Sequence, residues 1–146
     1  MAGYSREPIL APRTILRLIP AIAPAVPPSL PAHPPPERWT LSADDAATAT
    51  LVIPADARRE RRFEIACAIT VSVPASASAP WHQMTVQADG TQLWRRRLPS
   101  SNPDSWDGLD YRFSRSVAVG RTLRITVAVA CQGARRRTLV IEADEL

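Results

Sequence analysis

The sequence predicts an all-β protein: an antiparallel sandwich of about seven strands, preceded by an extended proline-rich N-terminal arm. From Trp39 onward, apolar and polar residues alternate with a period of two, which is typical of strands with one buried face. Clusters of Gly, Pro, Asn, Asp and Ser recur between these short runs, as in sandwiches and barrels. Ten of the fifteen prolines fall at or before Pro36. We therefore divide the chain into an arm or linker, residues 1–38, and a β-sandwich domain, residues 39–146.

Length and composition narrow the class further. A chain of 146 residues has room for one domain with a modest core. Its 45% of hydrophobic residues includes only two phenylalanines, which predicts an aliphatic core. The net charge of +4 is small beside the 14 interspersed carboxylates, so the charge balance is no signature of nucleic-acid binding.

The arm cannot fold by itself. Each proline fixes φ and removes a backbone donor, so the segment favours polyproline II and excludes an internal strand. Residues 12–19 also fit a short helix with Pro12 in its first turn. The arm is unusually apolar for a linker, which suggests a surface that a protein partner covers; a partly disordered tether is the alternative. The candidate partner-binding residues of the arm are Ile9, Leu10, Ile15, Leu16, Leu18, Ile19 and Ile22.

The first two strands are expected at residues 47–53, ended by Pro54, and at residues 62–73. The second has the clearest alternation in the chain. Its predicted core face consists of Phe63, Ile65, Cys67, Ile69, Val71 and Val73.

A hairpin follows, with strands at residues 84–88 and 91–98. Between them lies Asp89-Gly90, a dipeptide that suits a type I′ turn because both central residues need positive φ. Residues 99–109 are rich in turn-forming types and are expected to form a long loop.

The last three strands are expected at residues 111–119, 122–131 and 138–143. Short turns at Gly120 and at residues 132–134 separate them, so we expect a meander of neighbouring strands. The pairing of the first two strands stays open, and a jelly roll or open barrel also fits.

The two cysteines are expected on core-facing positions of long central strands. Cys67, Trp81 and Cys131 have an order and spacing that resemble immunoglobulin-like sandwiches. Val129 stands where those domains place a corner tyrosine, so we interpret the likeness as one of architecture, immunoglobulin-like or jelly-roll-like. We expect both thiols to be buried and reduced, with a disulfide as the alternative.

Candidate catalytic residues are few. His33 lies in the arm and His82 at a strand start, and buried thiols would be inert partners for them. We therefore expect neither an enzyme nor a bound cofactor. An oxygen-rich stretch offers weak Ca²⁺ candidates, although turn-forming loops use the same residue types; these candidates are Asp104, Asp107 and Asp110.

Arginines and one tryptophan supply the remaining candidates. A basic rim forms if the strand ends converge, and it would contain Arg95, Arg97, Arg135, Arg136 and Arg137. Such a rim can bind phosphates, but strand-end charges are more often solvated edges that oppose aggregation. Trp106 lies in the predicted polar loop, where an exposed ring can anchor a protein or a sugar.

These observations favour a noncatalytic interaction or assembly subunit that docks on a larger complex through its arm; a homo-oligomer is also compatible with them. The alternatives are a carbohydrate or Ca²⁺ module built on residues 102–110, and an Arg-mediated contact with phosphate or nucleic acid. No apolar run is long enough for a membrane span. Pro20 and Pro24 interrupt the only stretch that imitates a secretion signal, so a cytoplasmic protein or a particle component is favoured over a secreted one.

Overall fold

A computed structural model describes residues 23–25, 27–29, 32–101 and 105–146. The predicted contact residues of the arm between Ile9 and Ile22, and Asp104, lie outside these ranges. The chain divides into two units, residues 1–34 and 35–146. Every described residue before Pro35 is exposed and belongs to no helix or strand.

The described part of residues 35–146 forms eight strands. The unexpected one is the first, which directly follows the proline run. The strands are β1 (Arg38–Ser42), β2 (Thr48–Ile53), β3 (Arg61–Ser72), β4 (Trp81–Ala88), β5 (Thr91–Pro99), β6 (Trp106–Val117), β7 (Leu123–Gln132) and β8 (Arg135–Glu145).

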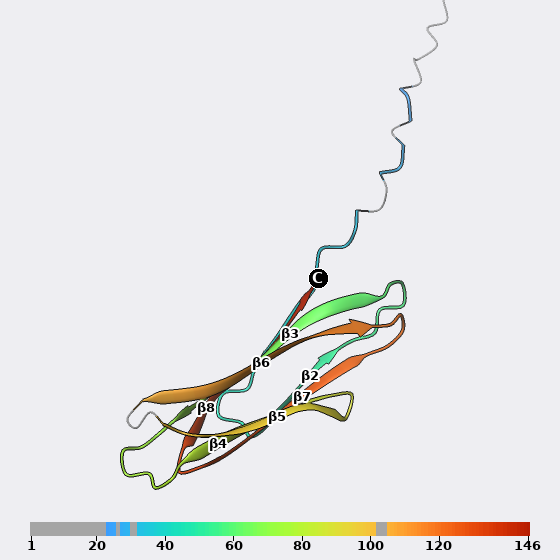
Figure 1. The fold of residues 1–146 in the computed structure, drawn as a ribbon. Coiled ribbons are helices and arrows are strands. Elements are labelled where there is room, and N and C mark those ends of the chain that lie inside the picture. The colour runs from blue at the N-terminus through green and yellow to red at the C-terminus, as the bar shows by residue number, and fades with distance from the viewer. Residues whose placement is uncertain (1–22, 26, 30–31, 102–104) are drawn as a thin grey trace, which may run out of the picture. The chain divides into compact units, whose positions relative to one another are not determined.

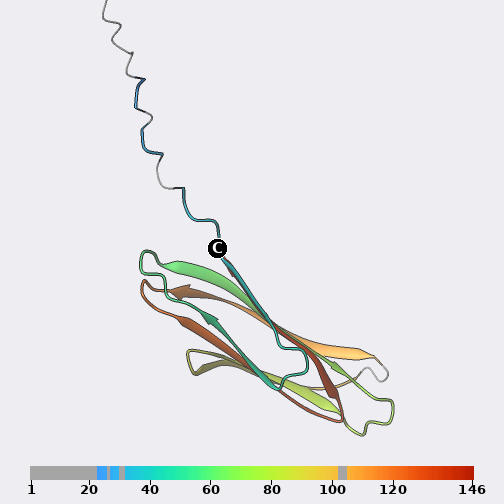
Figure 2. The ribbon, with the colours of Figure 1, turned by 180° about the vertical axis from the view of Figure 1, so that it is seen from behind.

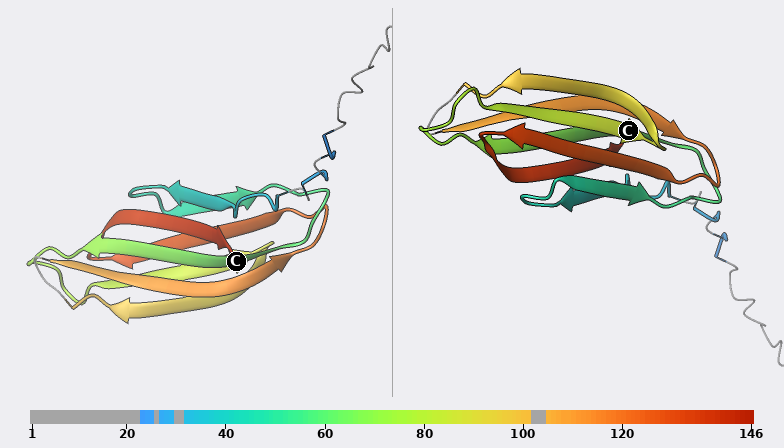
Figure 3. Two further views of the ribbon diagram at one scale, coloured as in Figure 1. Left: turned by 90° about the horizontal axis from the view of Figure 1, so that it is seen from above. Right: turned by 90° about the horizontal axis from the view of Figure 1, so that it is seen from below.

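The strands build two four-stranded antiparallel sheets that face each other (Figures 1 and 2). The strand orders are β1-β8-β3-β6 in one sheet, called sheet A, and β2-β7-β4-β5 in the other, called sheet B. Strands β1 and β2 lie along one side of the sandwich, and β5 and β6 along the other (Figure 3). The predicted all-β sandwich is therefore confirmed. The described residues include no helix of the length and hydropathy needed to cross a membrane.

The core lies between the sheets and is mainly aliphatic. Alternation along β3 buries every second side chain, as the sequence predicts. Phe63 is the one fully buried aromatic ring among the described residues. Other core side chains that are 0–1% exposed are Ile53, Ile65, Ile69, Met84, Val86, Leu123, Ile125, Leu139 and Ile141.

The predicted β4–β5 hairpin is confirmed. Asp89 and Gly90 adopt φ values of 48° and 80°, which agrees with a type I′ turn. The register shifts by one residue between Val86 and Gln87. This bulge decides which side chains of β5 face outward.

The predicted meander is wrong. Strand β6 pairs with β3 in sheet A, β7 pairs with β2 and β4 in sheet B, and β8 pairs with β1 and β3 in sheet A. Both short turns therefore cross between sheets instead of closing hairpins. A link such as residues 118–122 is long enough for this, because packed sheets lie only about 10 Å apart and each extended residue spans about 3.3 Å.

The detailed comparison with immunoglobulin-like domains is also corrected. Trp81 is half-buried at the start of β4 and lies beside the exposed pair partners Pro99 and Gln132, whereas in antibody domains the tryptophan is buried on the disulfide. Cys67 is fully buried, but Cys131 at the end of β7 is only half-buried. Neither forms a disulfide in the structure.

The two thiols are expected to differ sharply in reactivity. Burial raises the pKa of the Cys67 thiol to about 12, and the thiolate is the reactive species. Iodoacetamide at pH 8 should therefore modify Cys131 in the native protein and Cys67 only after denaturation. Peptide mass spectrometry of both samples measures this, and equal native labelling of both residues would contradict the packing of β3.

The sandwich has two distinct ends. The links at residues 43–47, 73–80 and 133–134 gather at one, called the loop end, together with Ser100, Ser101 and Ser105. Residues 54–60, 89–90 and 118–122, with Glu37 and Leu146, gather at the other, called the arm end. The candidate site residues divide between these ends.

Candidate functional site

Trp106 and two of the predicted rim arginines meet at the loop end. Trp106 is the first residue of β6, not part of a loop, and it is 58% exposed. The Arg137 guanidinium lies 5.8 Å from the centre of its ring, and Arg137 Nε donates to Ser72 Oγ at 2.8 Å. Together they border a hollow of about 420 Å³, which is lined by Ser72, Val73, Pro74, Ser105, Trp106, Arg135 and Arg137.

A second tryptophan–arginine pair lies on the outer face of sheet B at the same end. The Arg97 guanidinium stacks 3.8 Å from the centre of the Trp81 ring. Gln83 Oε1 accepts from Arg97 Nε at 3.1 Å and from Arg95 Nη2 at 3.2 Å. Trp81 Nε1 donates to Gln132 Oε1 at 2.9 Å. Both partners of the stack are therefore held in place by side-chain hydrogen bonds.

The predicted basic rim is divided between two faces. Arg95 and Arg97 lie on the outer face of sheet B with Gln83, whereas Arg137 bonds to Ser72 on sheet A. Arg136 Nε donates to the carbonyl of Asp45 at 2.9 Å. The strand ends converge, but the arginines face different directions and each set is paired with a tryptophan.

The carboxylates considered for Ca²⁺ do not converge within the described residues. Asp107 and Asp110 both lie on β6, three residues apart, so alternation places them on opposite faces. Asp107 already accepts the backbone N–H groups of Ser101 at 3.1 Å and Gly108 at 2.9 Å. In the described ranges no three acidic, histidine or cysteine side chains are placed to hold a metal ion.

His82 forms a buried polar pair with Ser100. Its Nδ1 lies 2.8 Å from Ser100 Oγ, and its Nε2 lies 3.4 Å from the carbonyl oxygen of Gly108. His82 is 0% exposed and Ser100 is 7% exposed. A nucleophile and its base must reach a substrate, and this buried pair does not. We therefore interpret it as a structural link between β4, β6 and the 100–101 loop.

The arm end holds a cluster of charged side chains, which we call the arm-root cluster. Arg61 is 3% exposed, and its Nη1 donates to Glu37 Oε2 at 2.8 Å. Arg59 bonds to Glu145 through both terminal nitrogens and to Glu37 through one. Asp56 lies 3.5 Å from Arg59 Nε. Glu37 is thus fixed to β3 and β8 immediately after the proline run.

Two carboxylates of the arm-root cluster have lowered pKa values. For Glu145 the main cause is the hydrogen bond from Arg59, assisted by the backbone N–H of Glu37 and opposed by burial. For Asp56 it is the hydrogen bond from the backbone N–H of Arg58, at 2.7 Å. Each of these groups is therefore more acidic folded than unfolded.

This difference predicts a loss of stability in acid. A carboxylate with a lowered folded pKa stabilises the fold above its unfolded pKa, about 4.5 for Glu, and that contribution disappears as the pH falls through the folded pKa. We expect the melting temperature to fall below about pH 4.5 and to fall less steeply in Glu145→Gln. Calorimetry from pH 7 to 3 measures the slope. The exposed control Glu60→Gln should retain the wild-type slope, and identical slopes in all three proteins would contradict the prediction.

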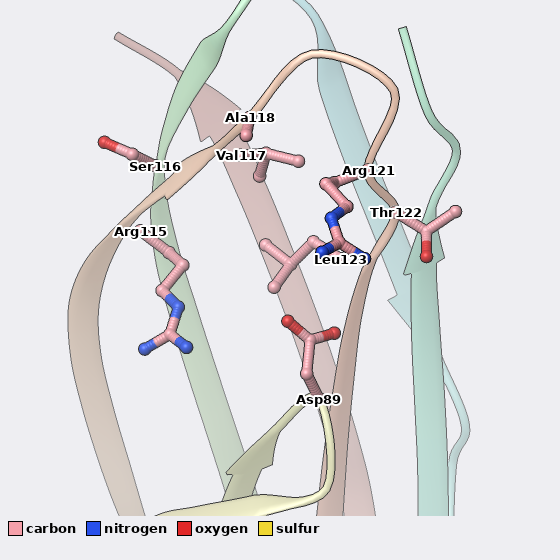
Figure 4. A pocket seen from close by; sticks show the side chains of 8 residues that line it. All are labelled: Asp89, Arg115, Ser116, Val117, Ala118, Arg121, Thr122 and Leu123. Atoms are coloured by element: carbon pink, nitrogen blue, oxygen red, sulfur yellow. The ribbon is translucent and has the colours of Figure 1, made fainter.

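A separate hollow of about 400 Å³ lies between the 89–90 turn and the β6–β7 link. Figure 4 shows the Asp89 carboxylate pointing into it toward Arg121, with Arg115 on the opposite wall. Asp89 Oδ1 accepts the backbone N–H of Arg124 at 2.9 Å. Two guanidiniums against one carboxylate leave one net positive charge, and Asp89 would repel an anion entering beside it.

Comparison with known proteins adds only distant similarities. No protein-family model and no curated protein matches the chain. Dimeric latent PorU from Porphyromonas gingivalis is similar over 75% of this chain and 13% of its own, with a TM-score of 0.42 and 14% identity. The EclA C-terminal domain, a sugar-binding protein, is similar over 72% of this chain and 74% of its own, with a TM-score of 0.36 and 13% identity. The delta-endotoxin Cry8Ea1 from Bacillus thuringiensis is similar over 76% and 19% (TM-score 0.36, 16% identity).

The sequence reasoning did not find the Trp81–Arg97 pair or the arm-root cluster. The hairpin around Asp89-Gly90 places Trp81 near residues 97–99, so the Trp81–Arg97 pair could have been predicted from the sequence. For the second, Glu37 and Glu145 are separated by 108 residues, and no local pattern links them.

Proposed function

We propose that this protein is a noncatalytic interaction subunit that docks on a larger assembly through its proline-rich arm. The observation that carries this proposal is the arm-root cluster. Glu37, the first residue after the proline run, is bonded to Arg61 at 2.8 Å and to the backbone N–H of Glu145 through its own carbonyl at 2.9 Å. The residue from which the arm leaves the sandwich is therefore held by hydrogen bonds to β3 and β8.

The composition of the arm supports docking for an energetic reason. Proline has already restricted the unfolded states of the arm, so ordering it on a partner costs less conformational entropy than ordering a flexible tail. The apolar side chains from Ile9 to Ile22 gain burial in return, at roughly 25 cal/mol per Å². A tether alone would need neither property.

An affinity capture from the native source tests the proposal. The full chain, a chain lacking residues 1–36, and a full-length chain with Leu16, Leu18 and Ile19 changed to Ser are compared as baits. A photo-cross-linking residue at Leu10 identifies a directly contacted protein. We expect one stoichiometric partner that is cross-linked by the arm and lost with both arm variants. Equal recovery by all three baits would overturn the proposal.

A second function is favoured by the geometry around Trp106. Its exposed ring beside Arg137 borders a hollow of about 420 Å³, and an exposed ring with adjacent planar donors suits a sugar. Glycan-array binding that Trp106→Ala abolishes at an unchanged melting temperature would support this function. The absence of any bound glycan would argue against it.

A further inference from the structure

The loop end carries an apolar hollow of about 360 Å³ on the outer face of sheet B. It is lined by Ala79, Pro80, Trp81, Arg97 and Pro99. An apolar surface that contains an aromatic ring is the kind that binds polyproline II segments, because such segments present ridges of pyrrolidine rings.

The walls of this hollow are fixed before any ligand enters. The Pro80 carbonyl accepts the backbone N–H of Ser100 at 2.8 Å. Ala79 adopts a φ of 43°, a strained conformation for a residue with a side chain. Gly133 makes room for Pro80, since a Cβ there would lie 3.1 Å from Pro80 Cβ. With Trp81 held by Gln132, the hollow is preorganised, which lowers the entropic cost of binding.

The chemistry of the hollow also matches a proline-rich ligand. Such a ligand offers many carbonyl acceptors but few N–H donors, because proline has none. Arg97 donates through Nε to Gln83, while its terminal nitrogens have no acceptor among the described residues and are available to ligand carbonyls. The segment 24–34 of this chain contains three P-x-x-P motifs, at residues 24–27, 28–31 and 31–34, and no Asp, Glu, Lys or Arg, so the arginines do not repel it.

The length of the sandwich decides whether residues 27–31 can reach the hollow of their own chain. Strand β3 has 12 residues, which makes the sandwich about 40 Å long at about 3.3 Å per residue. Glu37 lies at the arm end and Trp81 at the loop end. Residue 27 lies ten residues before Glu37, so a polyproline II chain from Glu37 back to residue 27 spans only about 31 Å. Residues 27–31 therefore fall short of the hollow in their own chain.

We propose that the Trp81 hollow binds residues 27–31 of a second copy of this protein. The inference rests on the proposed docking role of the arm and names its partner. Because donor segment and hollow lie at different places on the molecule, the contact is heterologous, and each bound copy leaves one arm and one hollow free. Successive copies would form a head-to-tail chain or a closed ring.

Analytical ultracentrifugation of the full chain over a range of concentrations tests this. We expect mass to rise with concentration, and Trp81→Ala to weaken association about 30-fold, the effect of losing a hot-spot tryptophan. A full-length chain with Pro27, Pro28 and Pro31 changed to Ser should be weakened to a similar extent. Val119→Ala, an exposed apolar residue in the β6–β7 link at the arm end, is the control and should associate like wild type. Melting temperatures confirm that each variant is folded.

Mixing the two weakly associating variants gives the decisive result. Trp81→Ala retains a donor segment and the proline variant retains a hollow, so together they should form a dimer that cannot grow. A monomeric full chain at all concentrations, or undiminished association of Trp81→Ala, would overturn this inference. If arm-dependent capture of a different protein persists in that case, the proposed docking function stands and only its self-association is wrong.

Discussion

Replacing Glu37 with Ala is expected to lower the free energy of unfolding by about 3 kcal/mol and the melting temperature by roughly 10 °C. The change removes the carboxylate that pairs with Arg61, whose side chain is only 2% exposed. The Nε of Arg61 has no hydrogen-bond partner in the described structure, so its guanidinium would keep little beyond the carbonyl of Pro54. An uncompensated buried charge is among the costliest defects that a single substitution can introduce.

Urea denaturation followed by circular dichroism measures this change. Glu37→Gln is the matched variant, because it keeps the shape and one acceptor oxygen, and it should lose less stability. Arg38→Ala is the control at the neighbouring position. It removes exposed ion pairs with Glu142 and Asp144, and exposed pairs contribute at most about 1 kcal/mol. If Glu37→Ala were as stable as Arg38→Ala, the arm root would not depend on this cluster.

Gly108→Ala is the second large effect, an expected loss of about 3 kcal/mol or failure to fold. A Cβ at Gly108 would lie 2.5 Å from the backbone carbonyl oxygen of Ile69. That carbonyl belongs to β3, which is paired on both edges, so it cannot move without disturbing the ladder. Overpacking a rigid site costs about 1–3 kcal/mol, and any shift of β6 would also disturb the 3.4 Å contact between the Gly108 carbonyl oxygen and His82 Nε2.

Gly120→Ala is the control, because it replaces a glycine without creating a steric clash. Gly120 has a φ of +72° and nothing within 4 Å of a built Cβ. Gly120→Ala should therefore cost about 1 kcal/mol, through backbone strain alone. Chemical denaturation of both variants tests the comparison, and equal losses would show that the close approach of β6 to β3 is not what requires Gly108.

Local chemistry was sufficient to predict most strands. The alternation in β3 identifies its buried face because a period of two belongs to strands alone, and Asp89-Gly90 fixes a turn by its need for positive φ. Partner choice is different. A five-residue link at Gly120 has the same composition whether it closes a hairpin or crosses between sheets, so the meander was predicted where β6 and β7 belong to different sheets.

The bulge in the hairpin shows a second limit. Without it, Trp81 would pair with Leu98 and the side chains of Arg95 and Arg97 would face the core. The one-residue shift after Val86 pairs Trp81 with Pro99 instead and turns Trp94 inward, where it stacks on Tyr111 at 4.8 Å. Burial of apolar rings and hydration of arginines select this register, but that energy exists only once both sheets are assembled.

The candidate site was partly predictable for the same reason. Trp106 and Arg137 were both recognisable as exposed functional types, but their contact requires β6 and β8 to flank β3, which no local pattern states. The arm-root cluster could not be predicted because Arg61 is buried, although it lies in a polar stretch that indicates an exposed loop. Long-range pairing, not residue type, was the missing information.

The first and last residues of the sandwich lie side by side, and this has a practical consequence for engineering. Glu145 N donates to the carbonyl of Glu37 at 2.9 Å, and Leu146 N donates to the carbonyl of Arg62 at 2.8 Å. A tag fused after Leu146 would stand beside Glu37, the residue at the root of the arm. A circularly permuted sandwich, joined from Leu146 to Pro35 and opened in the exposed 74–76 stretch, keeps every strand pair and moves the attachment point to the opposite end.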